Sequence, residues 1–256
     1  MKYVDLNCDM GESTHLYPYR IENDLAILQH ISSVNIACGL HAGDAYTMHR
    51  LVETALNLGV AVGAHPSFPN RENFGRSDQY LEPAVLYDTL VYQIAALQGL
   101  IKVCGGSLFH VKAHGALYNL AARDAGVADT VCRAVKDLDD RLYVYVLSGS
   151  EMIAAARRAG LKTASEVFID RTYQENGLLT PRTQPGALIE DETGAISQAL
   201  QMVQEGTVTA TNGKTINVQA ETICLHGDGR FALKFARSIH EVFLRHDIQI
   251  RRPNHA

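Results

Sequence analysis

The stretch that decides the fold stands at the start of the chain: Asp5-Leu6-Asn7-Cys8-Asp9-Met10-Gly11-Glu12. Residues two apart on a strand share a face, so Asp5, Asn7 and Asp9 line one side of this predicted strand. Glu12 follows where the strand ends. A face of two carboxylates and an amide is poor material for a hydrophobic core. The pattern therefore predicts a site that handles protons or cations.

Apolar runs of strand length alternate with runs of helix length along the whole chain. The predicted strands are residues 3–7, 33–37, 60–64, 107–113, 142–147, 163–168 and 222–225. The predicted helices are residues 45–58, 83–104, 121–138, 150–159, 193–205 and 231–245. Gly59, Gly105 and Gly160 each follow a helix, as C-terminal caps do. This alternation predicts a parallel sheet that helices cover.

Polar residues follow most of the predicted strands, at their C-terminal ends. An open doubly wound sheet would gather such residues at one crevice, whereas a barrel spreads them over loops from several strands. The distribution favours a seven-stranded parallel β/α barrel of the TIM-barrel type, one domain over residues 1–256. A β-hairpin insertion is predicted at residues 208–218, because Asn212-Gly213 stands between alternating apolar flanks.

The composition excludes several classes of protein. The net charge of −5 gives no attraction to nucleic acid or to an anionic membrane surface. We expect no membrane-spanning run and find no signal segment at the start. The 5 cysteines are scattered and show no C-x-x-C pairing, so they predict buried, reduced thiols that fill apolar space. These features indicate a cytoplasmic protein.

The fourth predicted strand carries a second polar face, formed by His110, Lys112 and His114. A lysine in a central strand is costly to bury alone, so Lys112 needs a carboxylate partner or an anionic ligand. A purely structural pair with Asp5 or Asp9 is the alternative. Strands one and four then face each other, and the residues nearest the rim, Asp9 and His114, are the better catalytic candidates.

Other strands bring further polar residues to the same rim. His41, His65 and His226 follow the second, third and last strands. The remaining candidates are Asn35, Arg76, Asn119, Glu166, Arg171, Arg182 and Asp228. Asp44 is instead predicted to cap the helix that begins at residue 45. The chain has no phosphate-binding glycine loop, G-x-S-x-G or H-E-x-x-H. The histidines and carboxylates could hold a divalent metal, but their spacing does not decide this.

These motifs together resemble the LamB/YcsF family. The matching segments are residues 5–12, 33–44, 63–66, 73–76, 110–119, 166–171, 182–187 and 226–228, which run in order from the first strand to the last. The family often has proline at Ala113 and phenylalanine at Leu40. The resemblance implies a barrel related to sugar-deacetylase and glycosidase barrels. It also implies the A subunit of an ATP-dependent 5-oxoprolinase, which opens 5-oxo-L-proline to L-glutamate together with the B and C subunits.

A hypothesis for the roles of the residues follows from this resemblance. ATP phosphorylates the lactam oxygen, and water attacks the activated carbon with Asp9 or His114 as its base. Lys112 steadies negative charge, and His41 and His65 are further catalytic candidates. The predicted substrate-binding residues are Asn7, Glu12, Asn35, Arg76, Asn119, Glu166, Arg171, Arg182, His226 and Asp228, in which the arginines clamp the substrate carboxylate. Two alternatives remain: a metal-dependent amidase or deacetylase-like hydrolase acting alone, and a non-catalytic substrate-binding subunit.

Overall fold

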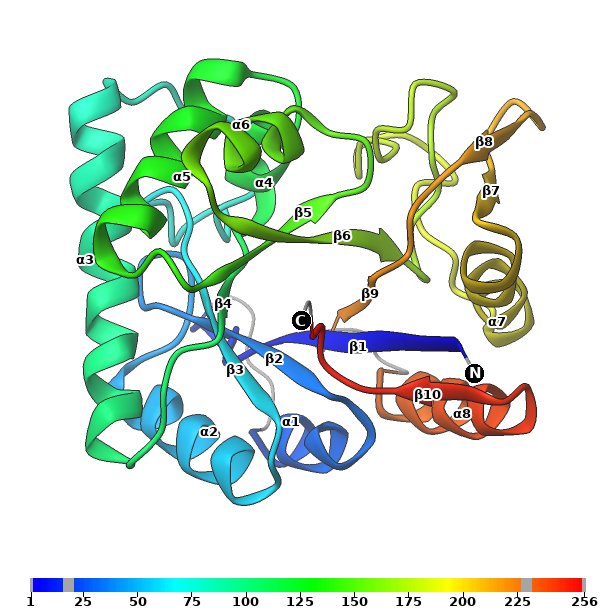
Figure 1. Ribbon diagram of the computed structural model, residues 1–256, viewed down its shortest axis with the longest axis horizontal. Helices are drawn as coiled ribbons and strands as arrows, with labels where there is room; N and C mark the ends of the chain where they lie inside the picture. The colour runs from blue at the N-terminus through cyan, green and yellow to red at the C-terminus, as the bar shows by residue number, and fades with distance from the viewer. Residues whose placement is uncertain (1, 16–20, 227–231, 255–256) are drawn as a thin grey trace.

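The computed structural model describes residues 2–15, 21–226 and 232–254 and shows a closed barrel (Figure 1). The barrel strands are β1 (Lys2–Met10), β2 (Ser33–Ala37), β3 (Ala61–His65), β4 (His110–Val111), β5 (Tyr143–Leu147), β6 (Lys162–Phe168) and β9 (Thr222–His226). They pair in parallel in this order, and β9 pairs back with β1. The structure therefore confirms the predicted seven-stranded barrel and excludes the open sheet.

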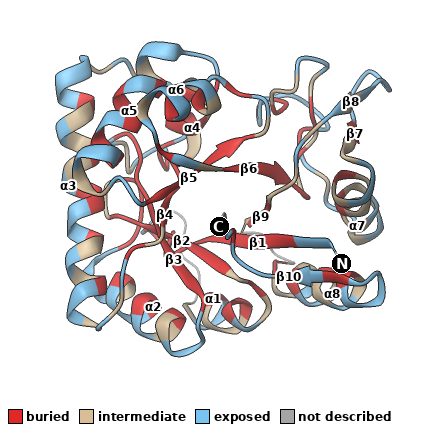
Figure 2. Cartoon of the chain, viewed as in Figure 1, coloured by how far each residue is buried: buried red, intermediate tan, exposed pale blue. Residues whose placement is uncertain are grey.

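Helices surround the strands on the outside of the barrel (Figure 1). They are α1 (Ile21–Ile27), α2 (Ala45–Asn57), α3 (Pro83–Val103), α4 (Gly115–Ala121), α5 (Ala125–Leu138), α6 (Glu151–Ala159), α7 (Glu192–Leu200) and α8 (Ala232–Arg245), with short turns η1 (Leu28–His30) and η2 (Gln201–Glu205). Their apolar faces pack on the outer face of the sheet, and burial is concentrated along the strands (Figure 2). The apolar core lies between these two layers.

Local capping sets several of the helix boundaries. Asp44 caps α2 as predicted, because its side chain accepts a hydrogen bond from the Thr47 amide at 2.9 Å. The single helix predicted over residues 121–138 is wrong at its start. Asp124 accepts from the Val127 amide and begins α5, so α4 is a separate helix. The sequence prediction also missed α1, η1 and a strand β10 (Ile248–Ile250), which pairs with the start of β1.

The hairpin insertion is confirmed. Strands β7 (Thr207–Thr209) and β8 (Thr215–Asn217) pair in antiparallel fashion. Gly213 in the turn has a φ of 81°, which an L-residue with a side chain rarely adopts. The hairpin lies beside the barrel in Figure 1, and its turn contacts the loop after β6, where the Thr211 amide donates to the Tyr173 carbonyl.

Helix α3 corrects one expectation about composition. It is long and apolar enough to cross a membrane by length and composition alone, although we expected no such run. In the structure it packs against α2, α5 and β3 in the outer layer of the barrel. Leu90, Ile94 and Leu97 are buried in that contact. Packing therefore explains its apolar content, and the cytoplasmic location stays a prediction.

Candidate functional site

The interior of the barrel is polar at its base. Asp5 accepts hydrogen bonds from Ser33 Oγ at 2.7 Å and from Thr222 Oγ1 at 2.6 Å. Burial raises the pKa of Asp5 despite these hydrogen bonds. The ring of His110 stacks on Tyr145, with 3.9 Å between centroids. These residues lie below the rim and support the layer above.

The next layer contains two asparagines that orient the carboxylates. Asn7 Nδ2 donates to Glu166 Oε1 at 2.9 Å. Asn35 Nδ2 donates to Asn7 Oδ1 and to Asp9 Oδ1, both at 2.7 Å, and Asn35 Oδ1 accepts from His110 Nε2 at 2.6 Å. Both asparagines are fully buried. Their hydrogen bonds are directed at the protein, so they position the acidic groups.

Lys112 lies between two carboxylates. Its Nζ is 2.8 Å from Asp9 Oδ1, 2.9 Å from Glu166 Oε1 and 3.0 Å from Cys224 Sγ. Burial alone lowers the pKa of Lys112, but Asp9 and the other neighbours outweigh it and raise the pKa well above its ordinary value. The predicted pair with Asp9 is present, while Glu166 is an additional partner. Cys224 thus contacts a charge, although it was predicted to be apolar filler.

Three histidines surround Glu12 at the rim. Glu12 Oε1 lies 2.8 Å from His114 Nδ1, 3.1 Å from His41 Nε2 and 3.6 Å from His65 Nε2. His65 Nε2 is also 3.4 Å from Asp9 Oδ2. The rings come from the C-terminal ends of three different strands, β2, β3 and β4. The sequence prediction that these histidines meet at one rim is therefore correct in its geometry.

Each histidine of this group forms a hydrogen bond to the protein through its other ring nitrogen. His65 Nδ1 donates to the Lys112 carbonyl at 2.7 Å, and His114 Nε2 donates to the Phe74 carbonyl at 2.8 Å. His41 Nδ1 is 2.9 Å from Ser67 Oγ, which itself donates to the Phe68 carbonyl and so accepts from the ring. The carbonyl partners place a hydrogen on His65 Nδ1 and on His114 Nε2, so a hydrogen bond from the other nitrogen to Glu12 or Asp9 requires a second hydrogen on that ring.

The pKa values divide this cluster into charged and neutral members. Burial raises the pKa of Asp9 and of Glu12, but the histidines beside them, and Lys112 at Asp9, outweigh it and hold both pKa values well below the ordinary range. Burial lowers the pKa of His41 to about 3, and it also lowers the pKa of His114. For His65, burial lowers the pKa, but Asp9 and Glu12 outweigh it and raise the pKa above 6.5. Asp9 and Glu12 are therefore anions, and His65 most readily holds a proton.

Above this cluster opens a cavity of about 630 Å³. Its floor includes Asp9, His65, Lys112, His114 and His226, and its wall includes Arg76, Tyr118, Asn119, Arg123, Arg171 and Arg182. The lining thus combines Asp9, Lys112 and three imidazoles with four guanidinium groups, one of which, that of Arg123, pairs with Asp78. A pocket of this size suits a small ligand or part of a larger one.

Arg171 is a buried cation on this wall, with an exposed fraction of 4%. Its guanidinium donates to the carbonyls of Thr180 at 2.6 Å and Ala187 at 3.3 Å, and it forms no ion pair within the described ranges. Burial and the nearby Arg182 lower the pKa of Arg171 to about 10. Arg76 stacks over the ring of Phe74 at 4.5 Å. A buried guanidinium that donates only to carbonyls, with two further arginines beside it and its charge only partly offset by Asp170, favours an anionic ligand.

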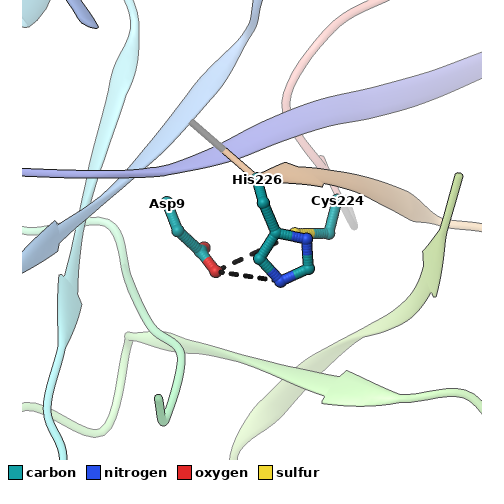
Figure 3. A group of neighbouring side chains, drawn as sticks. All are labelled: Asp9, Cys224 and His226. Carbon is teal, nitrogen blue, oxygen red and sulfur yellow. Dashed lines mark hydrogen bonds and ion pairs between the residues drawn. The ribbon is translucent and has the colours of Figure 1, made fainter. Parts of the chain in front are cut away.

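His226 closes the floor beside Asp9 (Figure 3). Its Nδ1 is 2.7 Å from Asp170 Oδ2, and its Nε2 is 3.9 Å from Asp9 Oδ2. Sequence reasoning selected His226 but missed Asp170, although Asp170 stands in the same matching segment as Glu166 and Arg171. It also missed Tyr118, whose pKa is raised well above its ordinary value by burial and by Glu166. Asp228 lies outside the described residues.

Two groups of side chains come close enough to hold a metal ion: Asp9, Cys224 and His226, and Glu12, His41 and His114. In the first, the ammonium of Lys112 already contacts both Asp9 and Cys224. In the second, the rings of His41 and His114 stack at 3.8 Å with 9° between their planes. Nearly parallel rings direct their in-plane lone pairs side by side instead of at one ion. Neither arrangement fits a divalent metal.

Comparisons with known proteins agree with one another. The model of the LamB/YcsF family matches residues 4–256. The protein of Bordetella parapertussis that is named as the A subunit of 5-oxoprolinase is 52% identical over 97% of this chain and 98% of its own length. A protein of the same name from Geobacillus kaustophilus is 48% identical over 99% and 98%. The crystal structure of a lactam utilization protein from Thermus thermophilus is 41% identical, with a TM-score of 0.89, and the match covers 98% of this chain and 99% of that one.

Proposed function

The chain belongs to the LamB/YcsF family, and from this premise we propose that it is the A subunit of a 5-oxoprolinase. The reaction is the hydrolytic opening of 5-oxo-L-proline to L-glutamate, with ATP as co-substrate of the complex and the B and C subunits as partners. The relatives from Bordetella and Geobacillus carry this name and match nearly the whole chain.

The observation that carries this proposal is that one cavity is lined both by Arg76, Arg171 and Arg182 and by Asp9 with the histidines. 5-Oxoproline carries a carboxylate and a lactam on the same small ring, so it can meet both groups at once. The guanidinium of Arg171, with Arg76 and Arg182 beside it, suits the carboxylate. This orientation directs the lactam toward Asp9 and the histidines.

The floor suits proton transfer at a lactam that ATP has activated. Phosphorylation of the lactam oxygen makes the ring carbon more electrophilic, and water then attacks it. Asp9 is ionised and lies at the cavity, so it can accept a hydrogen bond from that water. Lys112 uses its ammonium hydrogens on Asp9, Glu166 and Cys224, so it stabilises these groups in place. The arginines that line the cavity then stabilise the negative charge of the phosphorylated species.

Reconstitution of the complex tests the proposal. The chain is combined with the B and C subunits, and glutamate formation from 5-oxoproline and ATP is measured. We expect turnover by the complex, little by the chain alone, and a loss of at least about 100-fold in Asp9→Asn, because the ionised carboxylate that orients the attacking water is lost. Lys112→Ala should lose activity as well. Near wild-type glutamate formation by both variants would contradict the assignment of these residues to the active site.

The same assay separates the alternatives. Robust turnover by the chain alone, abolished by a chelator and restored by a divalent metal, would favour the metal-dependent amidase. Full activity of a complex with Asp9→Asn and His114→Gln, together with unchanged 5-oxoproline binding, would favour a non-catalytic binding role. Neither alternative has an observation in the site that favours it over the oxoprolinase assignment.

A further inference from the structure

His226 stands apart from the other histidines of the site. It ends β9, its ring packs on Phe168 with 5.8 Å between centroids, and its side chain is 12% exposed toward the cavity. His41, His65 and His114 are 0–4% exposed and use both nitrogens within the protein. Of the histidines on the cavity floor, His226 therefore has the better access to a ligand.

Asp170 fixes the tautomer of His226. Its Oδ2 lies 2.7 Å from Nδ1 and can only accept, so Nδ1 carries the hydrogen. Burial raises the pKa of Asp170, but His226 and the nearby arginines outweigh it and lower the pKa, so Asp170 is an anion. The lone pair of Nε2 then faces the cavity. A carboxylate that orients an imidazole in this way is the arrangement of an acid–base pair.

The opposite side of the gap is Asp9. The 3.9 Å between His226 Nε2 and Asp9 Oδ2 is too long for a direct hydrogen bond, but it spans a water molecule that is bonded to both (Figure 3). Asp9 itself is a weak base, because Lys112 and His65 hold its pKa well below the ordinary range. The water is therefore oriented by Asp9, and the lone pair of His226 Nε2 is placed to take its proton.

We propose that His226 is a catalytic residue that takes a proton from the attacking water and delivers it to the ring nitrogen, with Asp170 as its positioning residue. This inference rests on the proposed function. ATP transfers its terminal phosphoryl group to the lactam oxygen, and ADP and the N–H proton leave, which gives a cyclic imidate phosphate. Water adds to the C=N carbon: its oxygen forms the new C–O bond, the π electrons pass to nitrogen, and the water proton reaches nitrogen through His226 Nε2.

The tetrahedral adduct can break in two ways. If phosphate leaves, the lactam forms again and the ATP is wasted. If the C–N bond breaks, its electrons pass to nitrogen and the hydroxyl oxygen forms a carbonyl. The hydroxyl proton moves through His226 to nitrogen, so that the amine departs and an acyl phosphate remains. A second water hydrolyses this to L-glutamate and phosphate. Protonation of nitrogen by His226 therefore decides how tightly ATP use is coupled to ring opening.

The test compares products in the reconstituted complex. His226→Gln keeps an amide nitrogen near the position of the ring but cannot carry the proton. We expect glutamate formation to fall at least about 100-fold. Phosphate release from ATP in the presence of 5-oxoproline should fall less than glutamate formation, because the adduct that still forms then loses phosphate instead of the amine. The phosphate-to-glutamate ratio should thus rise strongly. His240→Gln, a half-buried histidine of α8 away from the cavity, is the matched control and should keep the wild-type ratio.

Asp170 is tested by the same ratio. Asp170→Asn should raise phosphate released per glutamate, and Asp170→Glu should restore part of the coupling, whereas a purely structural role would lower both products together. Added imidazole should recover glutamate formation in His226→Ala, because the cavity is large enough to admit it. These readouts do not depend on the absolute amount of folded variant.

The outcomes separate this inference from the function on which it rests. No turnover by the wild-type complex would overturn the oxoprolinase assignment and this inference with it. Wild-type turnover with an unchanged product ratio in His226→Gln would overturn the inference alone. Equal loss of glutamate and phosphate would confine His226 to steps before the adduct divides between its two routes, and would overturn its role in protonating the ring nitrogen.

Discussion

Gly63 leaves the space that the ring of His110 fills: a Cβ on Gly63 would lie 2.1 Å from His110 Nε2. That nitrogen donates to Asn35, which in turn holds Asp9. The absence of a side chain on β3 is therefore linked, through two hydrogen bonds, to the position of a carboxylate at the rim.

Gly63→Ala should disturb this chain of contacts. We expect about 1–3 kcal/mol of lost stability, the usual cost of overpacking a core, together with reduced turnover. Gly99→Ala on α3 is the control, because its added Cβ meets nothing within 4 Å and alanine favours a helix. Urea unfolding measures the stability, and glutamate formation by the reconstituted complex measures the turnover. A Gly63→Ala variant as stable as Gly99→Ala would contradict the packing argument.

Lys112→Met should destabilise the protein strongly. It leaves Asp9 and Glu166 buried without their shared cation, and removal of one partner from a buried ion pair typically costs about 3–5 kcal/mol. Lys136→Met, on the exposed face of α5, should stay within about 0.5 kcal/mol of wild type. Thermal and denaturant unfolding check the difference. Equal stability of the two variants would show that the charges are less buried than the structure indicates.

Stability should fall on acidification from about pH 6.5. Burial lowers the pKa of His41 to about 3 and lowers those of His110 and His114, so the unfolded chain binds protons that the folded chain does not. Their contribution is lost as the pH falls from 6.5 toward the folded values. The raised pKa of His65 has the opposite effect on stability, but it is one histidine against the three named above, whose pKa values are lowered.

Urea midpoints at pH 7.5, 6 and 5 measure this slope. His41→Gln should flatten it, and His49→Gln, on the exposed surface of α2, is the control. A midpoint that rises as the pH falls from 7.5 to 5 would mean that the buried histidines are charged in the folded protein.

Arg171→Met should weaken binding of 5-oxoproline by at least about 10-fold, because a charge-assisted hydrogen bond to a carboxylate contributes about 1.5–3 kcal/mol. Stability should also fall, by about 1–3 kcal/mol, because the buried carbonyl of Thr180 loses its donor. Arg157→Met, on the exposed face of α6, controls for net charge. Calorimetric titration measures the affinity for 5-oxoproline. An affinity equal to that of the wild type would mean that another arginine binds the carboxylate.

The sequence predicts much of this site because strands repeat every two residues. The spacing of Asp5, Asn7 and Asp9 places all three inside the barrel, because they lie on β1. Lys112 and His114 lie beyond β4, which ends at Val111, but their amides donate to the Ala64 and Pro66 carbonyls, so the same alternation continues. The spacing does not show that Asn7 hydrogen-bonds to Asn35 and Glu166 beneath the rim, because these three residues lie on different strands. The pairing of Asp170 with His226 spans 56 residues and depends on the pairing of β6 with β9, which are not consecutive in the chain.

Barrel closure between β1 and β9 also affects the order in which the protein can form. Asp9 lies on the first strand and His226 on the last, and they are partners in the register that joins these strands. During synthesis, β1 has its β2 neighbour early but lacks its other neighbour until nearly the whole chain has left the ribosome. Until then, β1 and β6 both present unpaired edges that can bind other chains. A nascent or truncated chain is therefore both inactive and prone to aggregation.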